Sequence, residues 1–310
     1  MINYSIIIPH KNSADLLTYC LSTIPMRDDV QVIVVDDNSD PQKVDFGNFP
    51  QWGGRNYEYY LTKEGKGAGY ARNVGLEHAK GKWVLFVDAD DYLLPTLYDI
   101  FNEFVNSDAD IIYFRPKAVM LKDRKSPSNR ADAYNNLIDE YFATRNEVKL
   151  RVRFFSPTCK FVKRELIEGN HIRFDEIKYS NDVLFAVKIG CAAKIIQVSE
   201  QSYYMITECD HSLRANFNKK KGEAEIRGEA FFRASDIIIQ NGYPFNKNEG
   251  YNYLNLLLLL DTELFAKYFR WTKRTMKQNT IGLLREMFKN SSIQSRIKRL
   301  PYALYVLILK

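Results

Sequence analysis

The sequence predicts an α/β domain built on a Rossmann-like, mainly parallel sheet flanked by helices, followed by a helical region. The first 115 residues alternate short apolar runs with segments of helical spacing. Two runs, Trp83–Val87 and Val30–Val35 with Gln31 as its one polar residue, are nearly continuous apolar segments, as in strands buried on both faces of a parallel sheet. From about Gly222 nearly every segment has helical spacing. We therefore expect the α/β domain over residues 1–221 and a basic helical region over 222–310.

The elements of the first part follow from local signals. The strands expected there cover Tyr4–Pro9, Val30–Val35, Tyr57–Leu61, Trp83–Val87 and Ile111–Phe114. The helices expected between them cover Ser13–Ile24, Gly69–Ala79 and Pro95–Ser107. Pro95 suits the first residue of a helix because no partner exists there for the N–H that proline lacks. Such β-α-β alternation predicts right-handed crossovers between parallel strands.

The middle of the chain is less regular. Residues 120–130 are polar and predict a loop. We expect helices over Asp132–Ala143 and Asp182–Ile189, and short strands over Phe154–Pro157 and Ile195–Val198.

Composition indicates a globular protein in a reducing compartment. Of the 310 residues 45% are hydrophobic, which excludes a disordered chain. The four cysteines form no CxxC pair and have no zinc-ligand spacing, so free thiols are expected. The N-terminus has no signal-peptide pattern, and the longest leucine run, Leu256–Leu260, is far too short to span a bilayer. These features predict a cytoplasmic protein.

Charge is unevenly distributed along the chain. The net charge is +6, but the segment Lys267–Lys310 holds 11 Lys/Arg and one Glu, a net of +10 that leaves about −4 for the rest. With the short apolar end, this tail predicts peripheral contact with the anionic inner face of the cell membrane. The alternative is a packed helical subdomain whose charges are solvated. No nucleic-acid motif is present, so no nucleic-acid partner is expected.

Two acidic clusters follow the two most apolar strands. Asp36 and Asp37 come after Val35, and Asp88, Asp90 and Asp91 come after Val87. Ligands of open parallel sheets bind outside the carboxyl ends of the strands, although either cluster could instead cap a helix or be solvated. Carboxylate oxygens suit Mg²⁺ or Mn²⁺, which often bridge a protein carboxylate to substrate phosphates. The clusters therefore predict a divalent metal and a phosphorylated ligand.

A glycine-rich segment, "KEGKGAGYARNVG" from Lys63 to Gly75, lies between the clusters. It matches neither the dinucleotide fingerprint nor a Walker A loop. Its glycines allow close approach of backbone to a ligand, and Arg72 offers a forked donor for phosphate. The alternative is a flexible loop before a helix.

Four stretches together resemble family 2 glycosyltransferases of the GT-A fold. In order they are "YSIIIPHKN", "VIVVDDNS", "GAGYARNVGLEHAKGKWVLFVDADDYL" and "FDEIKYSNDVLF". The resemblance is strong over residues 1–115 and moderate to about 215. It implies a metal-dependent, inverting hexosyl- or N-acetylhexosaminyltransferase using Mn²⁺ or Mg²⁺. The donor implied is a nucleoside-diphosphate sugar, in the first place a UDP-sugar. The acceptor implied is a hydroxyl of a glycan. A lipid-linked glycan, as in surface polysaccharide biosynthesis, would fit the basic tail.

The resemblance also implies roles for residues of the nucleotide site. Asp37 would accept from the base of the donor, as a carboxylate can from the imide N–H of uracil. Pro9 and Asn12 would lie beside the nucleoside. Arg72 and Asn73 match the "ARN" of the family and would border the nucleotide.

The remaining roles concern the metal and the proton. Asp88 and Asp90 match the DxD element, with Asp90 on the metal and Asp88 toward the ribose or a metal-bound water. Asp182 matches the acid that acts as general base. Independently of the resemblance, His211 follows the expected strand Tyr203–Ile206 and could close over the metal or diphosphate; the alternative is a hydrogen-bonded or exposed histidine.

This sequence departs from the family pattern at two places. Asn181 stands where the family usually has Glu before the base, so Asp175 or Glu176 could be the base instead. Lys11, in the first loop, could touch phosphate or be solvated. Two other functions stay open: a catalytically inactive adaptor of the same fold, and a sugar-nucleotide nucleotidyltransferase. The second needs a glycine-rich phosphate loop after the first strand, which "PHKNSADLL" lacks.

Overall fold

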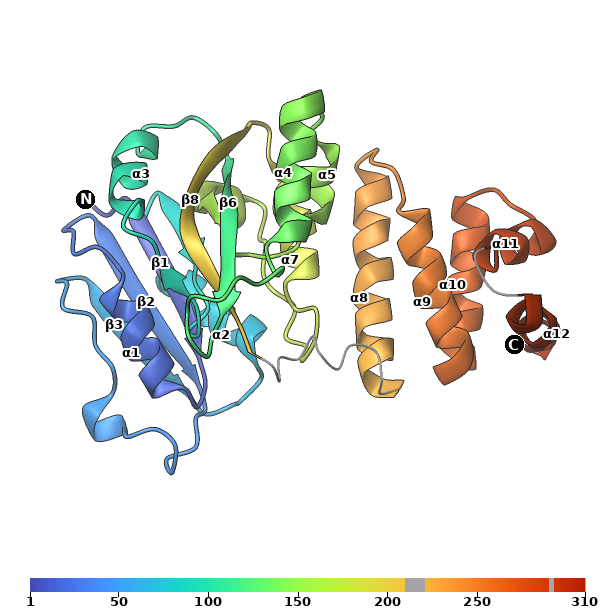
Figure 1. Cartoon of the computed structure of the whole chain (residues 1–310), viewed down its shortest axis with the longest axis horizontal. Helices are drawn as coiled ribbons and strands as arrows, with labels where there is room; N and C mark the ends of the chain where they lie inside the picture. Colours follow the sequence, from blue (N-terminus) through green and yellow to red (C-terminus); the bar gives the residue numbers. More distant parts are fainter. Residues whose placement is uncertain (210–220, 290–292, 310) are drawn as a thin grey trace. The chain divides into compact units, whose positions relative to one another are not determined.

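The chain divides into two compact units, Met1–Ser212 and Leu213–Lys310. The structure is a computed structural model that describes residues 1–209, 221–289 and 293–309. Figure 1 shows strands and helices in the first unit and helices alone in the described part of the second. The four cysteines are unpaired.

The described part of the first unit contains an eight-stranded mixed sheet, in the order β3-β2-β1-β4-β7-β6-β8-β5. Strands β3, β2, β1 and β4 are parallel to one another, β7 is antiparallel to both β4 and β6, and β8 is parallel to β6. The bounds are β1 (Tyr4–His10), β2 (Val30–Asp37), β3 (Tyr57–Thr62), β4 (Trp83–Phe86), β5 (Tyr92–Leu93), β6 (Ile111–Met120), β7 (Lys160–Lys163) and β8 (Ile196–Glu208).

The parallel strands are central to the core of this unit. Residues such as Ile6, Val32 and Leu85 are fully buried, which explains why β1, β2 and β4 are mostly apolar. The surrounding helices are α1 (Ala14–Ser22), α2 (Ala68–His78), α3 (Leu97–Phe104), α4 (Asp132–Thr144), α5 (Val148–Arg153), α6 (Arg164–Gly169) and α7 (Val183–Ala192). The predicted α/β architecture is therefore confirmed.

The strand predicted over Phe154–Pro157 is wrong. Phe154 ends helix α5, and its ring packs against Tyr134 and Tyr113 at centroid distances of 4.5 and 5.4 Å. Strand pairing resumes only at β7. A four-residue segment with two phenylalanines cannot by itself distinguish a strand from a buried loop, and here the Phe154 ring is held by aromatic packing.

The second unit is helical in its described residues and has its own apolar core. Its helices are α8 (Lys221–Gln240), α9 (Lys247–Leu260), α10 (Thr262–Thr275), α11 (Thr280–Met287) and α12 (Ile293–Leu309). Phe232 stacks on Tyr268 at 4.2 Å, and Leu254 and Leu283 are fully buried. Among the described residues, no helix has both the length and the apolar character needed to cross a membrane.

Candidate active site

A buried histidine–aspartate pair joins the ends of β1 and β2. His10 Nδ1 donates to Asp36 Oδ2 at 2.7 Å, while His10 Nε2 accepts from the Ser13 N–H, so the proton lies on Nδ1. Ser39 donates to Asp36 through both its N–H and its hydroxyl. Burial acts to raise the pKa of Asp36, but these hydrogen bonds outweigh it and lower the pKa. Asp36 therefore fixes two loops rather than facing a ligand.

Asp37 has one engaged and one free carboxylate oxygen. Its Oδ2 accepts from the Gly67 N–H at 2.9 Å and pairs with Lys11 Nζ at 3.2 Å. Its Oδ1 is buried and has no hydrogen-bond partner among the described residues. Leaving a buried acceptor unpaired is costly, so a ligand N–H would be favourable there. Lys11 is thus ion-paired with the acid next to this open oxygen.

Asn12 and Pro9 lie at the same edge of the sheet. Asn12 accepts from the Asp40 N–H at 2.7 Å, and its own N–H donates to Ser39 Oγ at 2.8 Å. Its φ of +56° lies in the left-handed region that asparagine tolerates. Pro9 is half-buried in β1, opposite Val35 of β2. Asn12 therefore holds the loop after β1 to the loop after β2.

Arg72 connects helix α2 to the DxD element and to the segment before α7. It is 6% exposed, donates through Nη2 to Asp88 Oδ1 at 2.7 Å and through Nη1 to Asn181 Oδ1 at 3.0 Å. Its guanidinium lies over the Phe174 ring at 5.3 Å. Arginine only donates, so this bond fixes the Asn181 amide with Nδ2 turned away from Arg72. No hydrogen bond from that Nδ2 is formed within the described chain.

Asn73 and Gly69 dock α2 against the same segment. Asn73 exchanges two hydrogen bonds with the Phe174 backbone, at 3.0 and 2.8 Å. A Cβ at Gly69 would lie 2.1 Å from the Asp175 carbonyl oxygen, so only glycine permits this approach. The polar atoms of the Asn73 side chain are therefore engaged by protein backbone.

Asp182 lies at the N-cap of α7, next to Asn181. It is partly exposed. Burial raises its pKa; the nearby Arg72 charge, a hydrogen bond from its own backbone and the nearby Lys160 charge oppose that rise. A carboxylate that accepts a hydrogen bond from no other described residue, with a raised pKa, suits a general base. Glu176, by contrast, pairs with Lys66 at 3.4 Å.

The three carboxylates after β4 are not equivalent. Asp91 is buried and accepts from the Tyr204 hydroxyl and the Thr207 N–H, both at 2.7 Å. The same Tyr204 oxygen accepts from the Asp88 N–H at 3.0 Å. Asp90 keeps solvent access, and surrounding protein together with the Asp88 charge raises its pKa to about 6. Asp91 is therefore tied to β8, and Asp88 and Asp90 remain for a ligand.

Asp88 and Asp90 fit a divalent metal. Both offer hard oxygens, and the raised pKa of Asp90 reflects a repulsion that a cation would relieve. Within the described residues, no three His, Cys, Asp or Glu side chains are arranged so that together they could hold a metal ion. Mg²⁺ or Mn²⁺ often needs only one or two carboxylates, with waters and phosphates completing the shell. His211 lies outside the described residues.

Two residues of this region carried no signal in the sequence. Lys160 is buried on β7, donates to the Phe154 carbonyl at 2.5 Å and has its pKa lowered to about 7 by burial, which the Asp182 charge partly opposes. Tyr204, on β8, holds the DxD element from more than a hundred residues away. Neither belongs to a motif, and only the topology brings them to this edge.

Comparison with known proteins now decides the family. Residues 5–169, more than half of the chain, match the family model of "Glycosyl transferase family 2". The chain belongs to glycosyl transferase family 2. It is 30% identical over 247 residues to "Poly(ribitol-phosphate) beta-glucosyltransferase" of Bacillus spizizenii, an alignment covering 76% of this chain and 36% of that protein. This family 2 chain thus spans little more than a third of that relative.

Solved structures establish the GT-A fold for this family 2 chain. The Staphylococcus aureus TarS 1-349 in complex with UDP-GlcNAc is similar with a TM-score of 0.60 and 20% identity, over 99% of this chain and 91% of that one. The mannosyltransferase PcManGT from Pyrobaculum calidifontis, in complex with GDP-Man and Mn²⁺, gives 0.52 and 18%, over 99% and 85%. The GT-A fold expected from the four sequence stretches is therefore confirmed.

Proposed function

We propose that this family 2 chain transfers glucose or N-acetylglucosamine from its UDP-sugar to a hydroxyl of a phosphodiester-linked polyol polymer, with inversion. The observation that carries this proposal is the Arg72 fork. One arm holds Asp88 of the DxD element, and the other holds Asn181, the neighbour of Asp182. The diphosphate side of the donor and the candidate base thereby share one edge of the sheet.

Each candidate residue has a definable task in binding the donor. Asp37 Oδ1 would accept from the imide N–H of uracil, while Pro9 and Asn12 shape the adjoining loop. Asp90 and Asp88 would hold Mn²⁺ or Mg²⁺, which when bound neutralises charge on the leaving diphosphate. The complex of a relative with GDP-Man and Mn²⁺ supports such a metal on this fold.

Asp182 would take the proton from the attacking hydroxyl. Apart from its own backbone, no described residue forms a hydrogen bond with its carboxylate, and its pKa is raised toward that of a useful base. Arg72 and Asn73 fix the segment that carries it. A single in-line displacement by this hydroxyl inverts the anomeric centre and needs no covalent intermediate.

The polymer acceptor is supported by the printed activity of a relative that acts on poly(ribitol-phosphate). The donor is supported by the UDP-GlcNAc complex of a structural neighbour. We further propose that the acceptor is lipid-linked and that the enzyme works at the inner face of the membrane. The basic residues Arg296, Lys298 and Arg299 in the sequence of α12 and its exposed side chains Tyr302, Tyr305 and Ile308 support this contact.

Acceptor-dependent release of UDP tests the proposal. The chain is incubated with Mn²⁺, a ribitol-phosphate oligomer and either UDP-glucose or UDP-N-acetylglucosamine, and the product is analysed for a β-linked sugar. UDP release that requires the oligomer, with a β product, is expected. Binding of UDP without any turnover would favour the inactive adaptor.

A further inference from the structure

Helix α10 carries a row of cations on the face opposite its buried side. Phe265, Tyr268 and Phe269 are buried, whereas the described residues that line a hollow of about 400 Å³ are all cations. These cations are Lys267, Arg270, Lys273 and Arg274. Like charges three or four positions apart destabilise a helix, so a bound anion would reduce the repulsion among these four cations.

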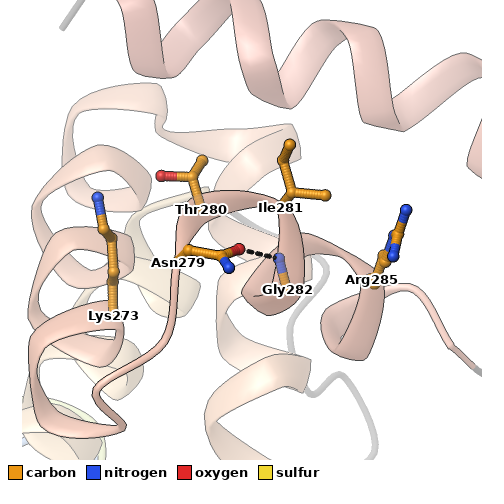
Figure 2. A pocket seen from close by; sticks show the side chains of 6 residues that line it. All are labelled: Lys273, Asn279, Thr280, Ile281, Gly282 and Arg285. Atoms are coloured by element: carbon orange, nitrogen blue, oxygen red, sulfur yellow. Dashed lines mark hydrogen bonds between the residues drawn. The ribbon is translucent and has the colours of Figure 1, made fainter.

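A second hollow, of about 480 Å³, adjoins the first and shares Lys273. Figure 2 shows Lys273 and Arg285 on opposite sides of the first turn of α11. Asn279 caps that turn by accepting from the Gly282 N–H at 2.7 Å. The row of cations therefore continues from α10 to Arg285.

Most of these cations lack an acidic partner. Lys267 pairs with Glu229 at 3.3 Å. Arg270, Lys273, Arg274 and Arg285 form no ion pair or hydrogen bond through their side chains with the described residues. Arginine forks match the paired oxygens of phosphate, so the cluster is suited to a ligand that carries phosphate groups.

The arrangement in two adjoining hollows favours a flexible chain as the partner. A planar layer of lipid headgroups reaches projecting cations better than cations that line a hollow. A single-stranded nucleic acid would stack its bases on aromatic side chains, and no aromatic residue is among the described residues that line either hollow. A polyol chain with repeated phosphates can bend into two adjoining hollows, and it carries a negative charge at each repeat that can pair with their cations.

We infer that the hollows lined by Lys267, Arg270, Lys273, Arg274 and Arg285 form a binding site for the phosphodiester groups of a polyol-phosphate chain. This inference rests on the proposed function for the identity of that chain as the acceptor. The site would hold phosphates of the polymer on the second unit, separately from the residues that carry out transfer.

Calorimetric titration of the full chain with a ribitol-phosphate oligomer, in EDTA and without donor, tests the inference. Wild-type protein should bind at low salt and lose affinity as salt rises. Arg270→Ala/Lys273→Ala should weaken binding by roughly tenfold. Arg55→Ala/Lys194→Ala, which removes the same charge from exposed positions of the first unit, should leave binding unchanged.

Three outcomes would overturn the inference. The first is that wild-type protein does not bind the oligomer at low salt. The second is that the Arg270→Ala/Lys273→Ala variant binds the oligomer as strongly as the wild-type protein does. The third is that this variant binds the oligomer normally and loses only its binding to phosphatidylglycerol vesicles or to single-stranded DNA. Titration and turnover are separable. Oligomer binding that depends on these cations, without sugar transfer, would refute the proposed function and support the site. Sugar transfer by the variant with an unchanged KM for the oligomer would support the proposed function and refute the site.

Discussion

At the residue scale, Asp90 shows how neighbouring carboxylates prepare a metal site. Partial desolvation and the Asp88 charge raise its pKa to about 6, so a divalent cation should be needed before a diphosphate can approach. We predict that Mn²⁺ strengthens UDP binding and that Asp90→Ala removes most of this gain. Calorimetry with UDP in Mn²⁺ and in EDTA measures both. Equal affinity in the two conditions for the wild-type protein would contradict the metal assignment.

Asn181 gives this chain a neutral neighbour beside its candidate base. Burial raises the pKa of Asp182 above that of an ordinary aspartate. The carboxylate should therefore become protonated and cease to act as a base as pH falls through this raised pKa, and turnover should fall with it. A negative charge at position 181 would raise that pKa further. Asn181→Asp should therefore move the acid limb of the kcat profile upward by roughly one pH unit.

The pH profile of turnover in Asn181→Gln serves as the control for that prediction. It keeps a neutral amide beside Arg72, so its acid limb should stay where the wild-type limb lies. An unshifted limb in Asn181→Asp, with turnover still measurable, would place the base at another residue.

At the element scale, the start of α2 depends on a glycine. A Cβ at Gly69 would meet the Asp175 carbonyl oxygen at 2.1 Å. Gly222 is likewise the second residue of its helix, but a Cβ there would have no atom of the described residues within 4 Å. We predict that Gly69→Ala lowers the free energy of unfolding by about 1–3 kcal/mol. It should also reduce turnover, because the segment carrying Asp182 must shift.

Gly222→Ala is the matched control and should be neutral or stabilising by up to about 1 kcal/mol. Urea unfolding of both variants gives the comparison. A Gly69→Ala protein with wild-type stability and turnover would show that the α2 contact does not position the base.

The sequence anticipated the elements where local pattern and tertiary role agree. The apolar runs of β1, β2 and β4 predicted buried parallel strands, and the acids that follow them lie at one sheet edge as expected. What it could not show is which acids are already engaged. Asp36 and Asp91 are satisfied by His10, Ser39, Tyr204 and Thr207, partners up to 116 residues away. The strand expected over Phe154–Pro157 failed for a similar reason, since aromatic packing from α4 and β6 decides its conformation.

At the scale of the whole molecule, the second unit presents an apolar helix face near the end of the chain. In α12, Tyr302, Tyr305 and Ile308 are 45%, 60% and 82% exposed, while Ala303 and Val306 are buried. Aromatic and aliphatic side chains of this kind partition into a membrane interface. We predict that Tyr305→Ser/Ile308→Ser reduces co-sedimentation with phosphatidylglycerol vesicles several-fold.

UDP affinity should be unchanged in this variant, because the candidate nucleotide residues lie in the first unit. The surface control is Tyr98→Ser, which alters an exposed aromatic residue of the first unit that is 51% exposed. Sedimentation of the α12 variant as strong as that of the wild-type protein would leave α12 as part of a packed helical subdomain.

Comparison of wild-type protein with Asp182→Asn tests whether the chain transfers a sugar from a UDP-sugar with Asp182 as the base. The quantity measured is UDP release from a UDP-sugar in Mn²⁺, with and without a ribitol-phosphate oligomer, beside UDP affinity by calorimetry. Release that requires the oligomer is predicted, and Asp182→Asn should lower it by roughly 10²–10⁴-fold at unchanged UDP affinity. Undiminished oligomer-dependent release by Asp182→Asn, or none by a folded wild-type protein that binds UDP, would contradict the account.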